Sequence, residues 1–262
     1  GRPGGWDGLP YVRKVLAWMR YDGVEPDAQC VAAAVRAHAA CGVPREAERM
    51  LFRECELRGY RPHRALVRTL LQFHGERGDG VSTLRLLGRL AAAKEGQKDA
   101  FHLSWRTRSG ELFDRVDQMP GVKRLPQDVL AAAAVALARG GMWAPAEPLF
   151  ATVVERVARK PRSRSRQGVA ARMLEQLVNT AGRTGSVDRC LLLLRWARLQ
   201  GVRVPAACYS GVIRGYGRRG LPHMGLRFLA EMRSADEAGI KEEKRQRRRA
   251  KRRRARARAV TV

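Results

Sequence analysis

The chain has 262 residues, enough for one large domain with a sizeable core or for two small ones. Lys and Arg number 52 against 25 Asp and Glu, which gives a formal net charge of +27. The apolar fraction of 45% excludes wholesale disorder, and no run of about 18 apolar residues predicts a membrane-spanning helix. Such a charge excess indicates a polyanionic partner, either nucleic acid or an acidic membrane surface.

Cysteines and histidines give no metal-binding pattern. The cysteines are odd in number and contain no C-x-x-C pair, so neither a disulfide framework nor a zinc ribbon is predicted: Cys30, Cys41, Cys55, Cys190 and Cys208. We expect each to be a small buried apolar residue in a reducing compartment. The histidines are scattered and are expected to be solvated or to cap helices: His38, His63, His74, His102 and His223. Because the first residue is Gly1, we expect the chain to be processed or incomplete.

Two series of glycines divide the chain into units of about 35 residues. One series precedes a proline by a few positions, at Gly23, Gly59, Gly121 and Gly201. The other series follows such prolines by about fifteen residues, at Gly42, Gly78, Gly141, Gly185 and Gly220. Each unit is predicted to hold two short helices, with the midpoint glycine as a left-handed cap on the first.

The second helix of each unit carries a small residue followed by an apolar pair, as in Ala146 with Leu149 and Phe150. Neither helix could bury its apolar stripe alone, so the units must stack into an all-α solenoid. The predicted units are a half repeat at 9–27 and repeats at 28–63, 64–97, 98–126, 127–165, 166–205 and 206–240. The unit at 98–126 is shortened, because Phe113, Val116, Met119 and Gly121 fit a second helix but the first is too short.

Two further segments depart from the repeat pattern. A basic loop covers residues 160–166, and an Arg- and Lys-rich tail covers residues 241–262, after a solenoid domain of about six degenerate repeats at 1–240. Trp18, Trp143 and Trp196 fall on predicted second helices and are expected in the core between repeats. For Trp105 core packing is favoured over stacking on a base.

The last repeat carries a family resemblance. Residues 208–220 read CYSGVIRGYGRRG and residues 225–232 read GLRFLAEM, which resembles the pentatricopeptide repeat pattern T-Y-N-T-L-I-x-G-x-x-x-x-G followed by A-L-x-L-F-x-x-M. Residues 15–27, VLAWMRYDGVEPD, resemble the second half of such a repeat with its terminal G-x-x-P-D. The tetratricopeptide repeat fits less well, because the step of about 35 residues and the terminal G-x-x-P-D match the longer pentatricopeptide unit. The resemblance covers roughly residues 9–240.

The resemblance implies binding of single-stranded RNA along a concave face, one base per repeat. The family's base-reading position maps to Ala32, Arg68, Ala131, Glu175 and Ser210, of which only Ser210 has the small polar side chain of the family. The second code position, normally Asp or Asn, holds His63 and Pro205. Sequence-specific recognition of RNA is therefore not expected.

Phosphate-binding residues fit better. The family often places a basic residue near the end of the first helix, which maps to Arg139, Arg183 and Arg218, although arginines there also complement a helix dipole. We expect RNA contacts from the basic loop through Arg162, Arg164 and Arg166. We expect further contacts from the tail, through Arg245, Arg247, Arg248, Arg249, Lys251, Arg252, Arg253, Arg254, Arg256 and Arg258. The alternatives for the tail are a solvated run or a localisation signal, and a membrane contact is disfavoured because no apolar face accompanies the charges.

These observations predict a structural RNA-binding component of a ribosome. The resemblance to pentatricopeptide repeat proteins implies that this ribosome is organellar, mitochondrial or alternatively chloroplast. The protein would hold ribosomal RNA beside neighbouring ribosomal proteins. The alternatives are a free organellar RNA stability or processing factor and a protein-binding solenoid scaffold. We expect no enzyme, cofactor, metal or small-molecule substrate, because no Walker loop, nucleophile elbow, paired-carboxylate site or deaminase zinc motif is present.

Overall fold

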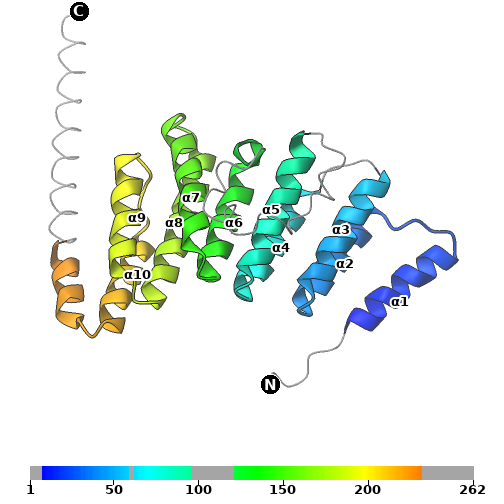
Figure 1. Cartoon of the computed structure of the whole chain (residues 1–262), viewed down its shortest axis with the longest axis horizontal. Coiled ribbons are helices and arrows are strands. Elements are labelled where there is room, and N and C mark those ends of the chain that lie inside the picture. The colour runs from blue at the N-terminus through cyan, green and yellow to red at the C-terminus, as the bar shows by residue number, and fades with distance from the viewer. Residues whose placement is uncertain (1–7, 59–61, 96–120, 232–262) are drawn as a thin grey trace, which may run out of the picture.

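The computed structural model describes residues 8–58, 62–95 and 121–231, and all regular structure within these ranges is helical (Figure 1). The α-helices are α1 (Gly8–Tyr21), α2 (Ala28–Ala40), α3 (Pro44–Arg58), α4 (Arg64–Glu76), α5 (Gly80–Glu95), α6 (Gln127–Arg139), α7 (Trp143–Ala158), α8 (Arg164–Arg183), α9 (Val187–Leu199) and α10 (Ala206–Arg218). A short 3-10 helix, η3, covers Val122–Arg124, and residues 222–231 are also helical.

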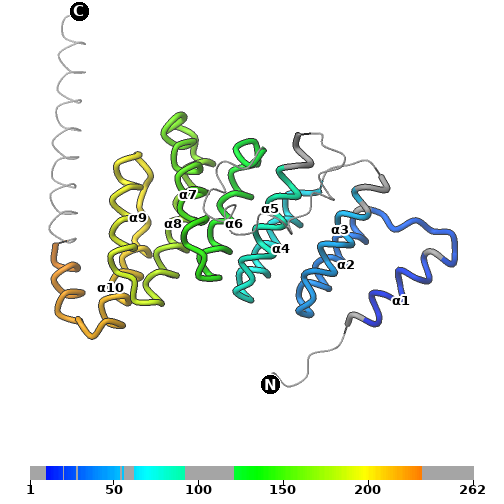
Figure 2. The backbone as a smooth tube through the Cα atoms, viewed as in Figure 1, coloured from blue at the N-terminus to red at the C-terminus, as the bar shows by residue number. Residues whose placement is uncertain are grey.

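The helices form two rows, as the backbone trace shows (Figure 2). The first helices of the repeats, α2, α4, α6, α8 and α10, contact one another in that order. Each of the second helices α3, α5, α7 and α9 packs on the first helix of its own repeat and on that of the next. The predicted all-α solenoid is therefore confirmed.

All five midpoint glycines adopt the left-handed backbone conformation that the repeat prediction requires, with φ values from 69° to 82°. At each one, the backbone N–H of the next residue donates to the carbonyl five residues back, as in Val43 to His38 and Leu221 to Tyr216, both at 2.9 Å. This hydrogen bond closes the end of the first helix, and only glycine reaches that conformation without steric cost. The glycine spacing thus sets where every first helix ends.

The stack contradicts one predicted repeat, the shortened unit at 98–126. Helices α4 and α6 pack directly on each other, so closely that a Cβ on Gly75 would lie 2.7 Å from the Cα of Ala136. No helix pair stands between them, because the contact leaves no room for one. Residues 98–120 lie outside the described ranges, and 121–126 form a turn with η3 against α5.

Consecutive repeats are also joined by arginine side chains. The Arg77 guanidinium donates to the carbonyl of Gly42, and the Arg219 guanidinium donates to the carbonyl of Gly185, at 2.6 and 2.7 Å. Each arginine directly follows a first helix and reaches the midpoint turn of the preceding repeat. These bonds fix neighbouring repeats to each other at their midpoint turns.

The tryptophan predictions are met in part. Trp143 and Trp196 are half-buried against the core, and the Trp196 ring lies 5.2 Å from that of Phe150. Trp18 in α1 is 58% exposed, so its predicted place in the core is wrong. It lies on α1, which packs on α2. Trp105 lies outside the described residues.

The cysteine prediction holds for three of the five residues. Cys55, Cys190 and Cys208 are buried, while Cys30 is half-buried and Cys41 is exposed. Burial raises the pKa of the Cys190 thiol to about 11 and that of Cys208 to about 12. These two thiols are therefore protonated, apolar core groups at neutral pH.

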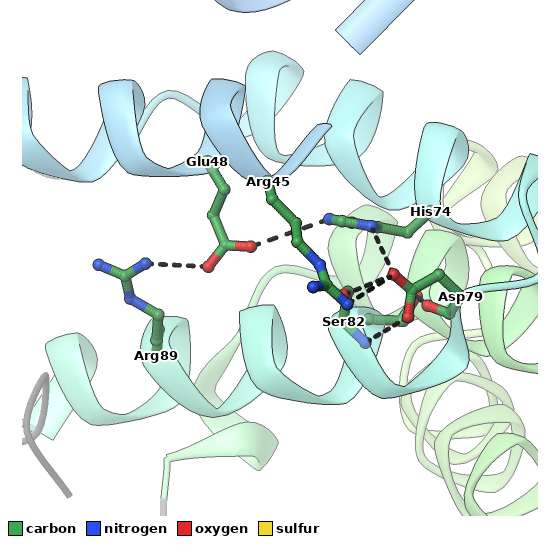
Figure 3. A network of polar contacts seen from close by, with 7 residues as sticks. Arg45, Glu48, His74, Asp79, Ser82 and Arg89 are labelled. Atoms are coloured by element: carbon green, nitrogen blue, oxygen red, sulfur yellow. Dashed lines mark hydrogen bonds and ion pairs between the residues drawn. The ribbon is translucent and has the colours of Figure 1, made fainter. Parts of the chain in front are cut away.

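The core of the first repeats contains a polar network that the sequence prediction missed (Figure 3). His74 in α4 is fully buried, not solvated, and so is His38, whose Nδ1 lies 2.8 Å from the carbonyl oxygen of Ala34. Buried Glu48 lies 2.9 Å from the Arg89 guanidinium, which also covers the Phe52 ring at 3.9 Å. The His74 ring sits between two carboxylates, 3.8 Å from Glu48 and 4.0 Å from Asp79.

Burial lowers the pKa of His74, more than nearby Asp79 raises it, and positive charges such as Arg45 lower it further. Its imidazole is therefore neutral at pH 7, and the contact with Glu48 is not a salt bridge. Burial raises the pKa of Asp79, but hydrogen bonds from the hydroxyl and backbone of Ser82 lower it overall. The network thus contains two carboxylates and two arginines around one uncharged histidine.

Candidate nucleic-acid interface

The exposed residues of α2, α4, α6, α8 and α10 form one side of the solenoid, which we call the first-helix face. Because each first helix ends at a midpoint glycine, residues at equal distances before these glycines occupy equivalent places on neighbouring helices. A depression of about 340 Å³ hollows this face over α4, α6 and α8. Its lining is mostly small, aliphatic or amide: Ala65, Arg68, Thr69, Gln72, Ala132, Val135, Ala136, Arg139 and Gln176.

The predicted base-reading residues are equivalent, each lying ten positions before a midpoint glycine: Ala32, Arg68, Ala131, Glu175 and Ser210. The Arg68 guanidinium extends to Asp128 of α6, at 3.7 Å. Ala131 is buried and Ser210 is exposed. The row therefore offers one free hydroxyl, a paired arginine, a carboxylate and two methyl groups. This chemistry cannot discriminate bases repeat by repeat, because discrimination requires a hydrogen-bonding group at each place.

The predicted phosphate-binding arginines form a row. Arg139, Arg183 and Arg218 are the last residues of α6, α8 and α10, and all three are exposed. Because packed helices are about 10 Å apart, this row presents cations at that interval along one edge of the first-helix face. None of the three forms an ion pair with another described residue. Their guanidinium groups are available to an external anion.

The row is restricted to the later repeats. The equivalent places in α2 and α4 hold Ala40 and Glu76, which cannot bind phosphate. A cation at the C-terminus of a helix also complements its dipole, so the three arginines stabilise their own helices as well. Both roles use the same exposed position.

The basic loop is divided between surface and structural arginines. Arg162 and Arg164 are exposed, as an RNA contact requires. Arg166 is half-buried, and its guanidinium donates to the backbone carbonyl of Arg156 at 3.2 Å. Arg166 therefore has a structural role, and its RNA contact stays a prediction. The side chain of Ser163 caps α8, which begins two residues before the predicted repeat boundary at 166.

The tail residues lie outside the described ranges, as does the boundary at 240. Their RNA contacts remain predictions: Arg245, Arg247, Arg248, Arg249, Lys251, Arg252, Arg253, Arg254, Arg256 and Arg258. The sequence prediction also missed exposed cations on loops between repeats outside the basic loop, namely Lys123, Arg124, Arg159 and Arg203. The signal was present, since each lies within a few residues of the proline or basic run that separates two repeats.

No cluster of His, Cys, Asp or Glu among the described residues could hold a metal ion. The described helices also include none that is long and apolar enough to cross a membrane.

No family model matches the chain, and no curated protein matches it. Among solved structures it is similar to the pentatricopeptide repeat protein PPR10 in complex with an 18-nucleotide psaJ RNA element, with 16% identity and a TM-score of 0.31 over 89% of this chain and 39% of that one. It is also similar to PPR10 from maize, with 18% identity and a TM-score of 0.29 over 88% of this chain and 37% of that one. The chain spans about two-fifths of the length of these proteins. The solenoid assignment therefore depends on the helix pairs and glycine caps of this chain itself.

Proposed function

We propose that the protein is a structural RNA-binding component of an organellar ribosome, most simply a mitochondrial one. It would hold ribosomal RNA through phosphate contacts from the solenoid and from the arginine-rich tail. The observation that carries the proposal is the exposed row of Arg139, Arg183 and Arg218, beside a face on which Ser210 alone of the five base-reading positions has the family's side chain. Cations that contact phosphates supply affinity, but they carry no sequence information unless other side chains contact the bases.

This combination suits an RNA whose position is set by its surroundings. A factor that must find one transcript needs base contacts, because phosphate contacts are the same for every sequence. A component of a folded ribonucleoprotein particle needs only shape and charge, since assembly has already placed the RNA. The organelle comes from the resemblance to pentatricopeptide repeat proteins, which work mostly in organelles.

Sedimentation of the tagged protein from mitochondrial lysate tests the proposal. We expect co-migration with one ribosomal subunit after magnesium chelation, through a moderate-salt wash, at near one copy per particle. Recovery in light fractions that ribonuclease shifts would contradict it and favour a free transcript-binding factor. Recovery in a complex that ribonuclease leaves intact would instead favour a protein-binding scaffold.

The tail provides a second test. Replacement of Arg247, Arg248, Arg249, Arg252, Arg253 and Arg254 with Gln should weaken RNA binding equally for all sequences and reduce its salt dependence, by about one slope unit for each phosphate that the tail no longer neutralises. Binding isotherms at several salt concentrations measure both. An unchanged slope would show that the tail is not an anchor.

A further inference from the structure

Two loops meet at the edge of the solenoid where α6 and α8 begin. The Arg156 side chain, at the end of α7, donates to the carbonyl of Leu125 at 2.7 Å and also to the carbonyl of Lys123. The Arg166 guanidinium donates in turn to the carbonyl of Arg156. Arg156 therefore holds the 121–126 loop against the end of α7, from which the basic loop continues.

A third contact closes this arrangement. The side-chain amide of Gln127, the first residue of α6, donates to the carbonyl of Arg166 at 3.2 Å. On the other side, Gly121 packs so closely on α5 that a Cβ there would lie 2.4 Å from the carbonyl oxygen of Ala91. The two loops are thus fixed relative to each other and to α5, α6, α7 and α8.

The surface that results is strongly positive. It presents six exposed cations, which we call the basic loop edge: Lys123, Arg124, Arg159, Lys160, Arg162 and Arg164. None of them forms an ion pair with another described residue. Of the carboxylates on α6 and α7, Asp128 pairs with Arg68 and Glu147 pairs with Arg189, while Glu155 contacts none of the six within ion-pair distance.

Positive charges also repel one another around Arg156, beneath this edge. Burial lowers the pKa of Arg156, and the positive charges of Arg166 and Arg159 lower it further. An anion placed on this edge would relieve that repulsion. The N-termini of α6 and α8 point to the same edge, and their dipoles add positive potential there.

We propose that the basic loop edge binds the phosphate backbone of base-paired RNA. Neither loop contains an aromatic residue, whereas proteins that hold unpaired strands depend on stacking of bases on aromatic rings. Duplex RNA is recognised instead by shape and by contacts to phosphates and hydroxyls. The proposal deepens the proposed function and rests on it only in taking RNA as the partner.

This edge is separate from the arginine row. Arg139 ends α6, whereas the basic loop edge lies where α6 begins, and a 13-residue helix is about 20 Å long. Figure 1 shows the loops between repeats along one edge of the solenoid and the midpoint turns along the other. The two sets of cations therefore contact different parts of a bound RNA.

The test compares two variants of the full chain, both in a background that carries the six tail substitutions. One has Arg124→Gln, Arg162→Gln and Arg164→Gln on the edge. The matched control has Arg13→Gln, Arg53→Gln and Arg85→Gln, which remove the same charge from exposed positions of α1, α3 and α5. The probes are an RNA hairpin of about 16 base pairs and an unpaired RNA of equal length.

We expect the edge variant to lower the salt slope of hairpin binding by about two to three units, and the control by less than about one. Loss of binding should be greater for the hairpin than for the unpaired strand. Equal slopes for the edge variant and the control would overturn the proposal, and so would a larger loss for the unpaired strand. If the edge variant lost hairpin binding but the protein sedimented apart from ribosomes, the ribosomal function alone would fail.

Arg156→Lys tests the positioning role of Arg156. The substitution keeps the charge but removes the two-pronged contact with the 121–126 loop, so a purely electrostatic account predicts unchanged binding. We expect the hairpin affinity to fall severalfold and the slope to decrease, while the unpaired strand is affected less. Unchanged hairpin affinity and slope would show that Arg156 does not position the edge.

Discussion

The repeats built from α2 to α5 and those built from α6 to α10 follow one plan but place their polar groups differently. Every buried polar or charged residue among those described belongs to the first group: His38, Glu48, His74, Ser82 and Thr83. In the second group the buried residues are apolar, and the arginine row and the basic loop edge lie on its surface. The glycine caps fix the plan in both halves, so the halves can differ in whether polar and charged groups are buried in the core or lie on the surface.

The largest effect is expected where the second group packs most tightly. A Cβ on Gly182 of α8 would lie 2.1 Å from the carbonyl oxygen of Gly211 in α10. Gly182→Ala must push these helices apart, so the free energy of unfolding should fall by about 3 kcal/mol in urea titrations. Gly217→Ala is the control, since a Cβ there meets no atom within 4 Å, and it should be neutral or slightly stabilising. Equal effects of both would contradict the close approach.

The two halves also offer ion pairs of equal length and unequal burial. Glu48 and Arg89 are 2.9 Å apart with side chains 5% and 21% exposed, whereas Glu147 and Arg189 are 3.0 Å apart and 40% and 36% exposed. Glu48→Gln should cost about 2 to 3 kcal/mol of unfolding free energy, because Arg89 then loses its charged partner in the core. Glu147→Gln should cost less than about 1 kcal/mol. Denaturant unfolding of both variants measures the two costs. Similar values would contradict the expectation that burial makes the Glu48–Arg89 pair more important for stability.

Stability should depend on pH through the first group. Because burial lowers the pKa of His74 in the folded chain, the unfolded chain binds a proton first as the pH falls. The stabilisation from neutral His74 is complete above its ordinary pKa of 6.5 and is lost as the pH falls below that value. The lowered pKa of Asp79 acts in a separate range, below its ordinary 3.8.

The free energy of unfolding, measured in urea at pH 7 and pH 5, should therefore decrease at the lower pH. His74→Phe, which fills the same space without a titrating group, should lose part of that decrease. An identical decrease in the variant would show that His74 does not titrate on unfolding.

The smallest effect is expected at the last midpoint turn. Gly220 has a φ of 72°, but a Cβ there would meet no atom within 4 Å, so only the backbone conformation is penalised. Gly220→Val should cost about 1 kcal/mol and lower the melting temperature by a few degrees. Gly168→Ala, at an open position of α8 with ordinary backbone, serves as the control. A melting curve unaltered by Gly220→Val would contradict the capping role.

Local signals explain what the sequence could predict. Helix ends depend on the conformation of one residue, so the spacing of Gly42, Gly78, Gly141, Gly185 and Gly220 sufficed to place the first helices and the solenoid. The equivalent positions of Arg139, Arg183 and Arg218 followed from the same spacing. These predictions needed no knowledge of which helices touch.

Contacts between distant residues were not predictable in this way. Buried His74 contacts Glu48 from another helix and Asp79 from the following turn, and no local sequence pattern predicts these contacts. Likewise, Arg156 and Leu125 are 31 residues apart along the chain, and only the packing of α7 shows that they meet. The shortened repeat was predicted from spacing alone, which cannot tell a stacked unit from an interruption.

The direct contact of Gly75 with Ala136 separates the geometry of the stack from the length of the chain. The pitch from α4 to α6 is set by two small residues in contact, so it does not depend on how many residues join α5 to η3. The connecting segment can therefore differ in length without altering the register of the repeats on either side. The connection between α5 and η3 is thus a position where an insertion would leave the stacking of the repeats unchanged.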